Sequence, residues 1–320
     1  MEQNLFVKEI ITANRGVSNM SSFIVTVDTE GDDLWNWSRG ENIKSENASY
    51  IPKFQELCEV YGVKPVYLVN YEMAMNDHLV NYLKPKFHEN KCEIGMHCHA
   101  WNTPPEYDIE EKYLGNPYIT EYPSDIMYQK MKYMTDILEQ KFEHKIVSHR
   151  AGRWASNPEM FSILKELGYK VDCSWVSHMN LLSIEGATTK TGFDYSHIEN
   201  KIYEPIEGII EVPMTSMKLH HCEGVRLRSK IKHMIIGEQV WLRTAVTSVN
   251  LMKQIIDKLN AEESEYIEFM IHSSELMPGG SPYFKDDKAI EEHFKSLSDI
   301  FKYAQKVCYF QTLDEFVNKR

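Results

Sequence analysis

The stretch Glu93-Ile94-Gly95-Met96-His97-Cys98-His99-Ala100-Trp101 places two histidines, two positions apart, at the end of a short apolar run. Residues two apart on a strand project to the same side. We therefore expect His97 and His99 to point together from a strand end, where two imidazoles make half of a metal site. The alternative is a pair of partly buried structural histidines. Other strand ends in the chain bear on this choice.

A second strand end carries acids instead of histidines. The apolar, β-branched run 23–27 predicts a buried strand, and Asp28-Thr29-Glu30 follows it directly. One strand end with histidines and another with carboxylates supply the ligands that a divalent-metal hydrolase uses. The alternative is that Asp28 and Glu30 cap the next element or are solvated loop acids.

Strand-like and helix-like segments alternate along the chain. This alternation predicts one parallel α/β domain over residues 22–320, either a barrel or a doubly wound sheet, preceded by a loosely tied arm, 1–21. Strands are expected at 23–28, 65–69, through His97 and His99, and at 145–148, 170–175, 209–213, 267–272 and 307–310. Helices are expected at 49–61, 77–84, 124–141, 158–167, 247–259 and 288–304, with Gly62 ending the first and Pro85 stopping the second.

The chemically reactive side chains share one position, because each lies at or near the C-terminal end of an expected strand. In an α/β barrel these ends converge on one rim, where active sites are found. This placement favours the barrel over the doubly wound sheet. The residues are Asp28, Glu30, His97, His99, Arg150, Asp172 and His272.

Composition excludes several classes of function. A formal net charge of -12 disfavours nucleic acid as the main partner. No apolar run approaches the ~18–20 residues of an integral membrane segment, and residues 1–22 contain no apolar core of signal-peptide length, so a cytoplasmic location is the default expectation. The 6 cysteines form no C-x-x-C pair and are expected to be scattered reduced thiols.

The order of these motifs resembles the NodB-homology polysaccharide deacetylases, carbohydrate esterase family 4, from Phe23 to Phe316. That family has a distorted (β/α) barrel, so the resemblance implies about seven parallel strands here. Its first motif, T-F-D-D-G, is similar to the run 26–31, in which Asp28 would be the catalytic base. Thr29 stands where the family has a metal-binding carboxylate, and Glu30 would take over that role.

The second and third family motifs also have counterparts. The motif H-[ST]-x-x-H resembles the run 97–101, in which His97 matches the first metal ligand. His99 would replace the second ligand, because Trp101 occupies its place. The motif R-x-P-x-G resembles the run 150–154, which keeps Arg150 and lacks the proline. Arg150 would hold the Asp28 carboxylate and keep it ionised.

The last two motifs supply an acid and aromatic residues. The run 172–175 is similar to the family's Asp–Trp motif, and the run 270–272 to its L-x-H motif. By this resemblance His272 would be the general acid, with Asp172 raising its pKa. Trp175, Trp101 and Tyr283 would line a sugar-binding groove, although aromatic residues in barrels also serve as core.

The resemblance implies a metal-dependent hydrolase that removes an N-acetyl group from an amino sugar in a glycan or a glycan precursor. Zn²⁺ is the cation expected first, held by Glu30, His97 and His99. Two alternatives stay open because the D-x-E and H-x-H motifs depart from the family pattern. One is a hydrolase of another C–N bond, such as a cyclic amide. The other is a catalytically idle barrel that acts as a binding subunit.

Overall fold

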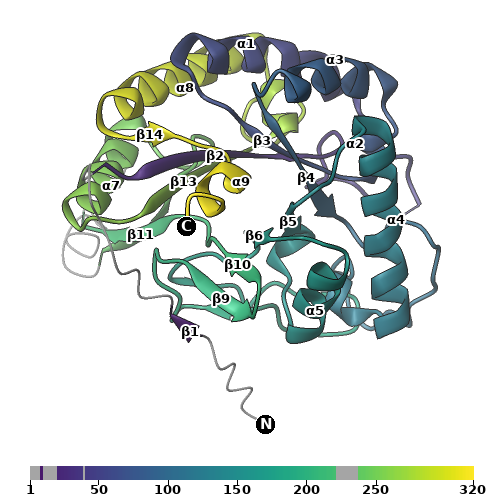
Figure 1. The fold of residues 1–320 in the computed structure, drawn as a ribbon. Helices are drawn as coiled ribbons and strands as arrows, with labels where there is room; N and C mark the ends of the chain where they lie inside the picture. The colour runs from purple at the N-terminus through teal and green to yellow at the C-terminus, as the bar shows by residue number, and fades with distance from the viewer. Residues whose placement is uncertain (1–7, 10–19, 39, 221–236) are drawn as a thin grey trace, which may run out of the picture.

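The computed structural model describes residues 8–9, 20–38, 40–220 and 237–320, and its largest feature is a curled sheet (Figure 1). Within the expected arm, 1–21, the structure describes residues 8–9 and 20–21, and the remainder of the arm lies outside the described residues. The strands of this sheet are β1 (Lys8–Glu9), β2 (Ser22–Thr29), β3 (Val66–Val69), β4 (Glu93–Cys98), β5 (Ser148–Ala151), β6 (Val171–Asp172), β9 (Tyr203–Ile206), β10 (Ile209–Glu211), β13 (Tyr266–His272) and β14 (Tyr309–Phe310).

The sheet runs in the order β1-β9-β10-β6-β5-β4-β3-β2-β13, and β14 pairs with β2. Every pair from β10 to β13 along this path is parallel, whereas β9 and β1 join antiparallel at one edge. The path from β10 to β13 contains seven strands. The prediction of a distorted barrel with about seven parallel strands is therefore confirmed, in the form of a half-barrel.

A short antiparallel pair lies at the opening of the half-barrel between β10 and β13. It consists of β11 (Ser216–Leu219) and β12 (Glu238–Trp241). The segments beside this pair bond to β13: Met270 N–H donates to the Leu242 carbonyl at 3.3 Å, and Glu268 N–H donates to Thr215 Oγ1 at 2.9 Å. These bonds satisfy part of the free edge of β13.

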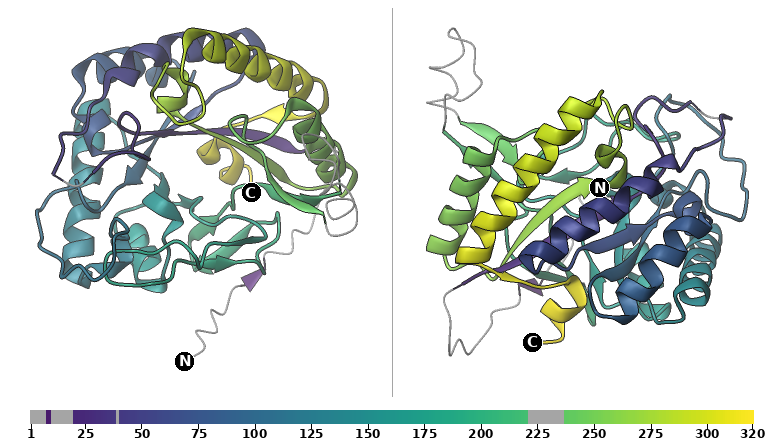
Figure 2. Two further views of the ribbon diagram at one scale, coloured as in Figure 1. Left: turned by 180° about the vertical axis from the view of Figure 1, so that it is seen from behind. Right: turned by 90° about the horizontal axis from the view of Figure 1, so that it is seen from above.

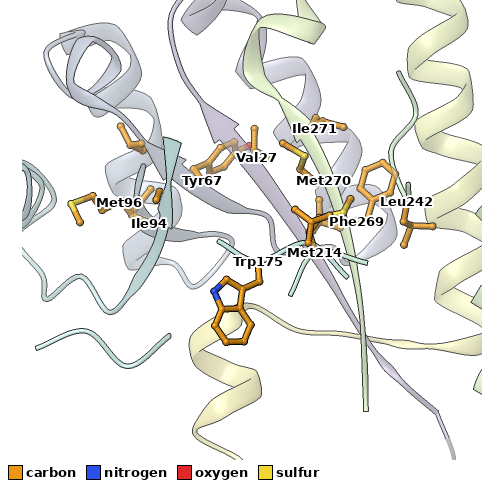
Figure 3. Packing of buried hydrophobic residues seen from close by; sticks show 14 of the residues in the cluster. Val27, Tyr67, Ile94, Met96, Trp175, Met214, Leu242, Phe269, Met270 and Ile271 are labelled. Atoms are coloured by element: carbon orange, nitrogen blue, oxygen red, sulfur yellow. The ribbon is translucent and has the colours of Figure 1, made fainter. Parts of the chain in front are cut away.

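Helices cover the outside of the curled sheet (Figures 1 and 2). They are α1 (Ile51–Tyr61), α2 (Tyr71–Ala74), α3 (Asp77–His88), α4 (Ser124–Phe142), α5 (Pro158–Glu166), α7 (Val249–Ala261) and α8 (Asp287–Val307). One more short helix, α9 (Leu313–Val317), lies inside the curl of the sheet (Figure 1). The core between sheet and helices is apolar, as Figure 3 shows around Phe269 and Leu242. Phe301 of α8 contacts both Phe54 of α1 and Phe269 of β13.

The interior of the barrel has its own apolar cluster, at the end of the strands away from the reactive residues. Leu313 and Phe316 of α9 pack there against Ile24 and Val66, at the starts of β2 and β3. Because α9 fills this end, the C-terminal ends of the strands are left as the end where polar groups gather.

Helix boundaries agree with the sequence pattern except at Pro85. Gly62 ends α1 in the left-handed conformation (φ 73°), as expected of a glycine there. Pro85 was expected to stop its helix, but α3 continues through it to His88. The proline removes one backbone donor, and the next turn still closes because Glu89 N–H donates to the Pro85 carbonyl at 2.9 Å.

Two long loops, 100–123 and 176–202, are tied together by Glu121. Its carboxylate accepts hydrogen bonds from the backbone N–H groups of residues 187–189 at 2.5–3.1 Å. Three N–H donors stabilise the ionised form, and the pKa of Glu121 is lowered although burial acts to raise it. The two loops are thus held as one wall beside the strand ends.

No helix among the described residues is long and apolar enough to cross a membrane. The described cysteines are buried free thiols, in agreement with the expectation of reduced thiols, and Cys222 lies outside the described residues.

Candidate active site

Three of the expected ligands converge at the ends of β2 and β4. One ligand atom from each of Glu30, His97 and His99 lies within 4.8 Å of the other two. Glu30 Oε2 is 3.3 Å from His99 Nε2 and 3.6 Å from His97 Nε2. All three side chains are buried. Two imidazole nitrogens and one carboxylate oxygen are a donor set that zinc takes in catalytic sites.

The orientation of His97 fits this use. Its Nδ1 lies 3.0 Å from the carbonyl oxygen of Arg150, which accepts only, so Nδ1 carries the proton and donates. The lone pair is then on Nε2, the atom nearer Glu30. Burial acts to lower the pKa of His97, but the Asp28 and Glu30 carboxylates outweigh it and raise that pKa.

His99 is held by contacts with two neighbouring residues. It stacks on Trp101, with 4.3 Å between ring centroids. The ring also lies close to Gly152, where an added Cβ would come within 2.3 Å of His99 Cδ2. A glycine at 152 therefore leaves the space that the ring occupies. Burial and the nearby His97 hold the pKa of His99 well below its usual value, which favours the neutral, ligating form.

Asp28, the expected base, is bonded to Arg150, as the motif resemblance implies. Arg150 Nη1 donates to Asp28 Oδ1 at 2.6 Å, and the same guanidinium donates to Glu268. Burial acts to raise the pKa of Asp28, but Arg150, His97 and His272 outweigh it and lower that pKa. Burial, in turn, raises the pKa of Glu268 to about 7 against the pull of Arg150.

Backbone strain lies directly after Arg150. Arg153 and Trp154 are consecutive non-glycine residues in the left-handed region, with φ 60° and 61°. Such conformations cost roughly 1–3 kcal/mol each and persist where the surroundings hold them. Here the Arg153 guanidinium donates to the carbonyls of Asn116 and Glu185, and the Trp154 ring covers the guanidinium of Arg150 at 5.1 Å.

His272, the expected acid, lies on the other side of the two carboxylates. Its Nε2 is 3.9 Å from Asp28 Oδ2 and 3.8 Å from Glu30 Oε1. Its Nδ1 lies 2.9 Å from Arg243 Nη2 and 3.4 Å from Glu275 Oε1. Burial acts to raise the pKa of Glu275, but Arg243 and His272 outweigh it and lower that pKa to about 2.

The prediction that Asp172 acts on His272 is corrected by this geometry, because Asp172 has other partners. Its Oδ1 lies 2.6 Å from His149 Nδ1, a residue paired with it across β5 and β6. Asp172 also pairs with Glu211 of β10, whose pKa is raised by burial and by Asp172. Asp172 therefore belongs to a buried polar row with His149 and Glu211 across β5, β6 and β10.

The three expected aromatic contacts have different surroundings. Trp175 is 2% exposed, packs on Phe161 and lies in the core (Figure 3), so the prediction that it contacts sugar is wrong. Trp101 lies beside His99, as described above. Tyr283 is 39% exposed and contacts Trp35, whose ring is 4.9 Å from that of His272.

Several residues at the site escaped the sequence interpretation. Trp35 belongs to an aromatic loop that carries no periodic signal, and Glu275 follows His272 by three positions in a turn. Arg243 comes from the end of the β11–β12 pair, and only the closing of the half-barrel brings it to His272. Glu268 was not singled out because it lies in the interior of its expected strand, away from the C-terminal end, and in the structure it bonds to Arg150.

No protein-family model matches the sequence, and the search of curated proteins found no match. Among solved structures, PuuE allantoinase is similar with a TM-score of 0.50 and 12% identity, over 93% of this chain and 88% of that one. The 4-alpha-glucanotransferase of Thermococcus litoralis is similar with a TM-score of 0.58 and 13% identity, over 94% of this chain and 40% of that one. Both likenesses concern the fold.

A carbohydrate esterase domain is also among the structural neighbours. The Xyl-CE4 domain of a multidomain xylanase, from the hindgut metagenome of Trinervitermes trinervoides, has a TM-score of 0.43 and 11% identity, over 94% of this chain and 91% of that one.

Proposed function

We propose that this protein is a metal-dependent hydrolase that removes an N-acetyl group from an amino sugar in a glycan or a glycan precursor. The observation that carries the proposal is the convergence of Glu30, His97 and His99 within 4.8 Å. Asp28 and His272 lie beside this group, with 3.9 Å between Asp28 Oδ2 and His272 Nε2. A ligand triad flanked by a carboxylate and an imidazole is suited to amide hydrolysis.

The site residues divide the proposed reaction into three roles: cation ligands, a base and an acid. Glu30, His97 and His99 would hold the cation, and Zn²⁺ suits their donor atoms. When bound, such a cation polarises an amide carbonyl and lowers the pKa of water. Asp28, kept ionised by Arg150, takes a proton from the attacking water. As the C–N bond breaks, His272 protonates the amine nitrogen, and acetate and the free amino sugar are released.

A cyclic-amide hydrolase is the second candidate. It is favoured by the likeness of fold to an allantoinase and by the D-x-E and H-x-H motifs. The same base and acid would open a ring C–N bond without releasing acetate. Acetate release from N-acetylated sugars therefore separates the two candidates, while a protein that binds no metal would be an idle barrel.

The test begins with metal content, because it requires no knowledge of the substrate. Elemental analysis of protein purified without chelator should give close to one equivalent of Zn or another divalent metal. The variant His97→Ala/His99→Ala should lose both metal and acetate release, whereas Asp28→Asn should keep the metal and lose turnover. Wild-type protein that stays metal-free after reloading, or an Asp28→Asn variant with wild-type rate, would contradict the proposal.

A further inference from the structure

A second feature lies beside the candidate metal centre: a pocket of about 480 Å³. Its walls include aromatic rings from two loops, with Trp37 from one and Trp101 and Tyr107 from the other. The rings of Trp37 and Trp101 are nearly parallel, with 6.4 Å between centroids. Flat aromatic faces of this kind bind the apolar faces of sugar rings and the charge of cations.

The pocket adjoins the metal centre through two residues. Trp101 lines the pocket and also stacks on His99, at 4.3 Å between ring centroids. Glu72 lines it as well, and its Oε1 accepts a 3.0 Å hydrogen bond from the backbone N–H of Gly31, next to Glu30. A molecule held at the metal centre would therefore have its next unit beside this pocket.

The charge of the pocket is negative. The described lining residues include four carboxylates, those of Glu41, Glu72, Asp108 and Glu111, and neither lysine nor arginine. Arg39 lies outside the described residues. Asp108 is exposed and has no hydrogen-bond or ion-pair partner for its side chain within the described part of the chain.

We propose that this pocket binds a sugar that carries a free, protonated amino group and is linked to the N-acetylated sugar at the metal centre. The inference rests on the proposed function and narrows its substrate class to partly deacetylated, cationic glycans. An ammonium group gains from the carboxylates and from the aromatic faces at once. A sugar with a carboxylate or phosphate in this position would be repelled by the same charges.

The experiment compares two disaccharides as substrates for the metal-loaded protein. One joins glucosamine to N-acetylglucosamine, in the linkage order that gives the faster acetate release, and the other is the fully acetylated pair. We expect kcat/KM for acetate release to favour the amine-bearing disaccharide by about tenfold at low salt, since each ion or cation–π contact is worth roughly two- to fivefold. The preference should shrink as salt screens the charges.

Variants locate the effect in the pocket. Glu41→Gln/Asp108→Asn should bring the ratio of the two kcat/KM values close to one. Glu110→Gln removes an exposed acid next to the pocket that does not line it, so this variant should keep the wild-type ratio. Equal kcat/KM values for wild-type protein on the two disaccharides, with acetate released from both, would overturn the inference and leave the proposed function standing.

A binding measurement separates a failure of the proposed function from a failure of the cationic pocket. If neither disaccharide releases acetate, the proposed function fails, and calorimetry with the fully deacetylated disaccharide tests the pocket alone. Binding that is at least fivefold weaker in Glu41→Gln/Asp108→Asn, and unchanged in Glu110→Gln, would support a cationic subsite. Equal binding by all three proteins, or no binding, would overturn it.

Discussion

Arg150 Nη1 donates a 2.6 Å hydrogen bond to Asp28 Oδ1 across a separation of 122 positions in the sequence. The guanidinium is completely buried, and its remaining donors go to Glu268, to Thr26 Oγ1 at 3.0 Å and to the Cys173 carbonyl at 2.9 Å. The residue that holds the proposed base therefore also joins β2, β5, β6 and β13. Catalysis and folding depend on the same contacts.

The variant Arg150→Met should lower the free energy of unfolding by about 3–5 kcal/mol, because it leaves the buried carboxylates of Asp28 and Glu268 without their partner. Urea unfolding at pH 7 measures this. The double variant Arg150→Met/Glu268→Gln should regain part of the loss, since one of the two buried charges is gone. A single variant with the wild-type unfolding midpoint would contradict the prediction.

Gly152→Ala should weaken metal binding by displacing His99, because the new Cβ would lie 2.3 Å from His99 Cδ2. The matched control is Gly62→Ala at the end of α1. That site has open space but a φ of +73°, so alanine there costs stability without touching the metal centre. Competition with a chromophoric chelator gives the affinities of both variants. Equal Zn²⁺ affinity in Gly152→Ala and wild-type protein would count against His99 as a ligand.

Glu275 should make folding stability depend on pH in the acid range. Its pKa is lowered from 4.5 to about 2, so the folded state favours the ionised carboxylate. The stabilisation is fully present above pH 4.5 and is lost as the pH falls through about 2, with a total of roughly 3 kcal/mol. Urea unfolding between pH 6 and pH 2 should show a shallower decline for Glu275→Gln than for wild-type protein. Parallel declines would refute this assignment.

Replacement by alanine should affect substrate binding at Trp35 and folding stability at Trp175. Trp35 is 38% exposed beside His272, so Trp35→Ala should raise KM for the sugar with little change in unfolding. Trp175 is 2% exposed, so Trp175→Ala should lower the free energy of unfolding by about 3–5 kcal/mol. Steady-state kinetics and urea unfolding of both variants provide the test. A stable Trp175→Ala protein with a raised KM would restore the sugar-contact role of Trp175.

The strand-end pairs could be predicted from the sequence because two simple regularities determine them. Residues two apart on a strand share a side, and parallel strands present their C-terminal ends together. These rules are sufficient to bring His97 and His99 to Asp28 and Glu30. They do not say which strand ends are neighbours, and β6 is separated from β13 by four strands of the sheet. For this reason Asp172 was expected to act on His272, whereas it bonds to His149.

Contacts made by turns and by the closing segment had no such signal. Arg243 reaches His272 only because β12 lies beside β13, and Glu275 does so through a short 3-10 turn, Ser273–Leu276. The continuation of α3 through Pro85 depends on bonds made by the following turn, which a proline signal alone does not reveal.

The bonds between Glu121 and residues 187–189 have a consequence for how this wall can be altered. A graft of the 100–123 loop alone onto another barrel would leave the Glu121 carboxylate without its three amide donors, and the reciprocal graft would leave those amides without an acceptor. The two loops therefore form one transferable cassette. Natural divergence and laboratory recombination alike should exchange them together.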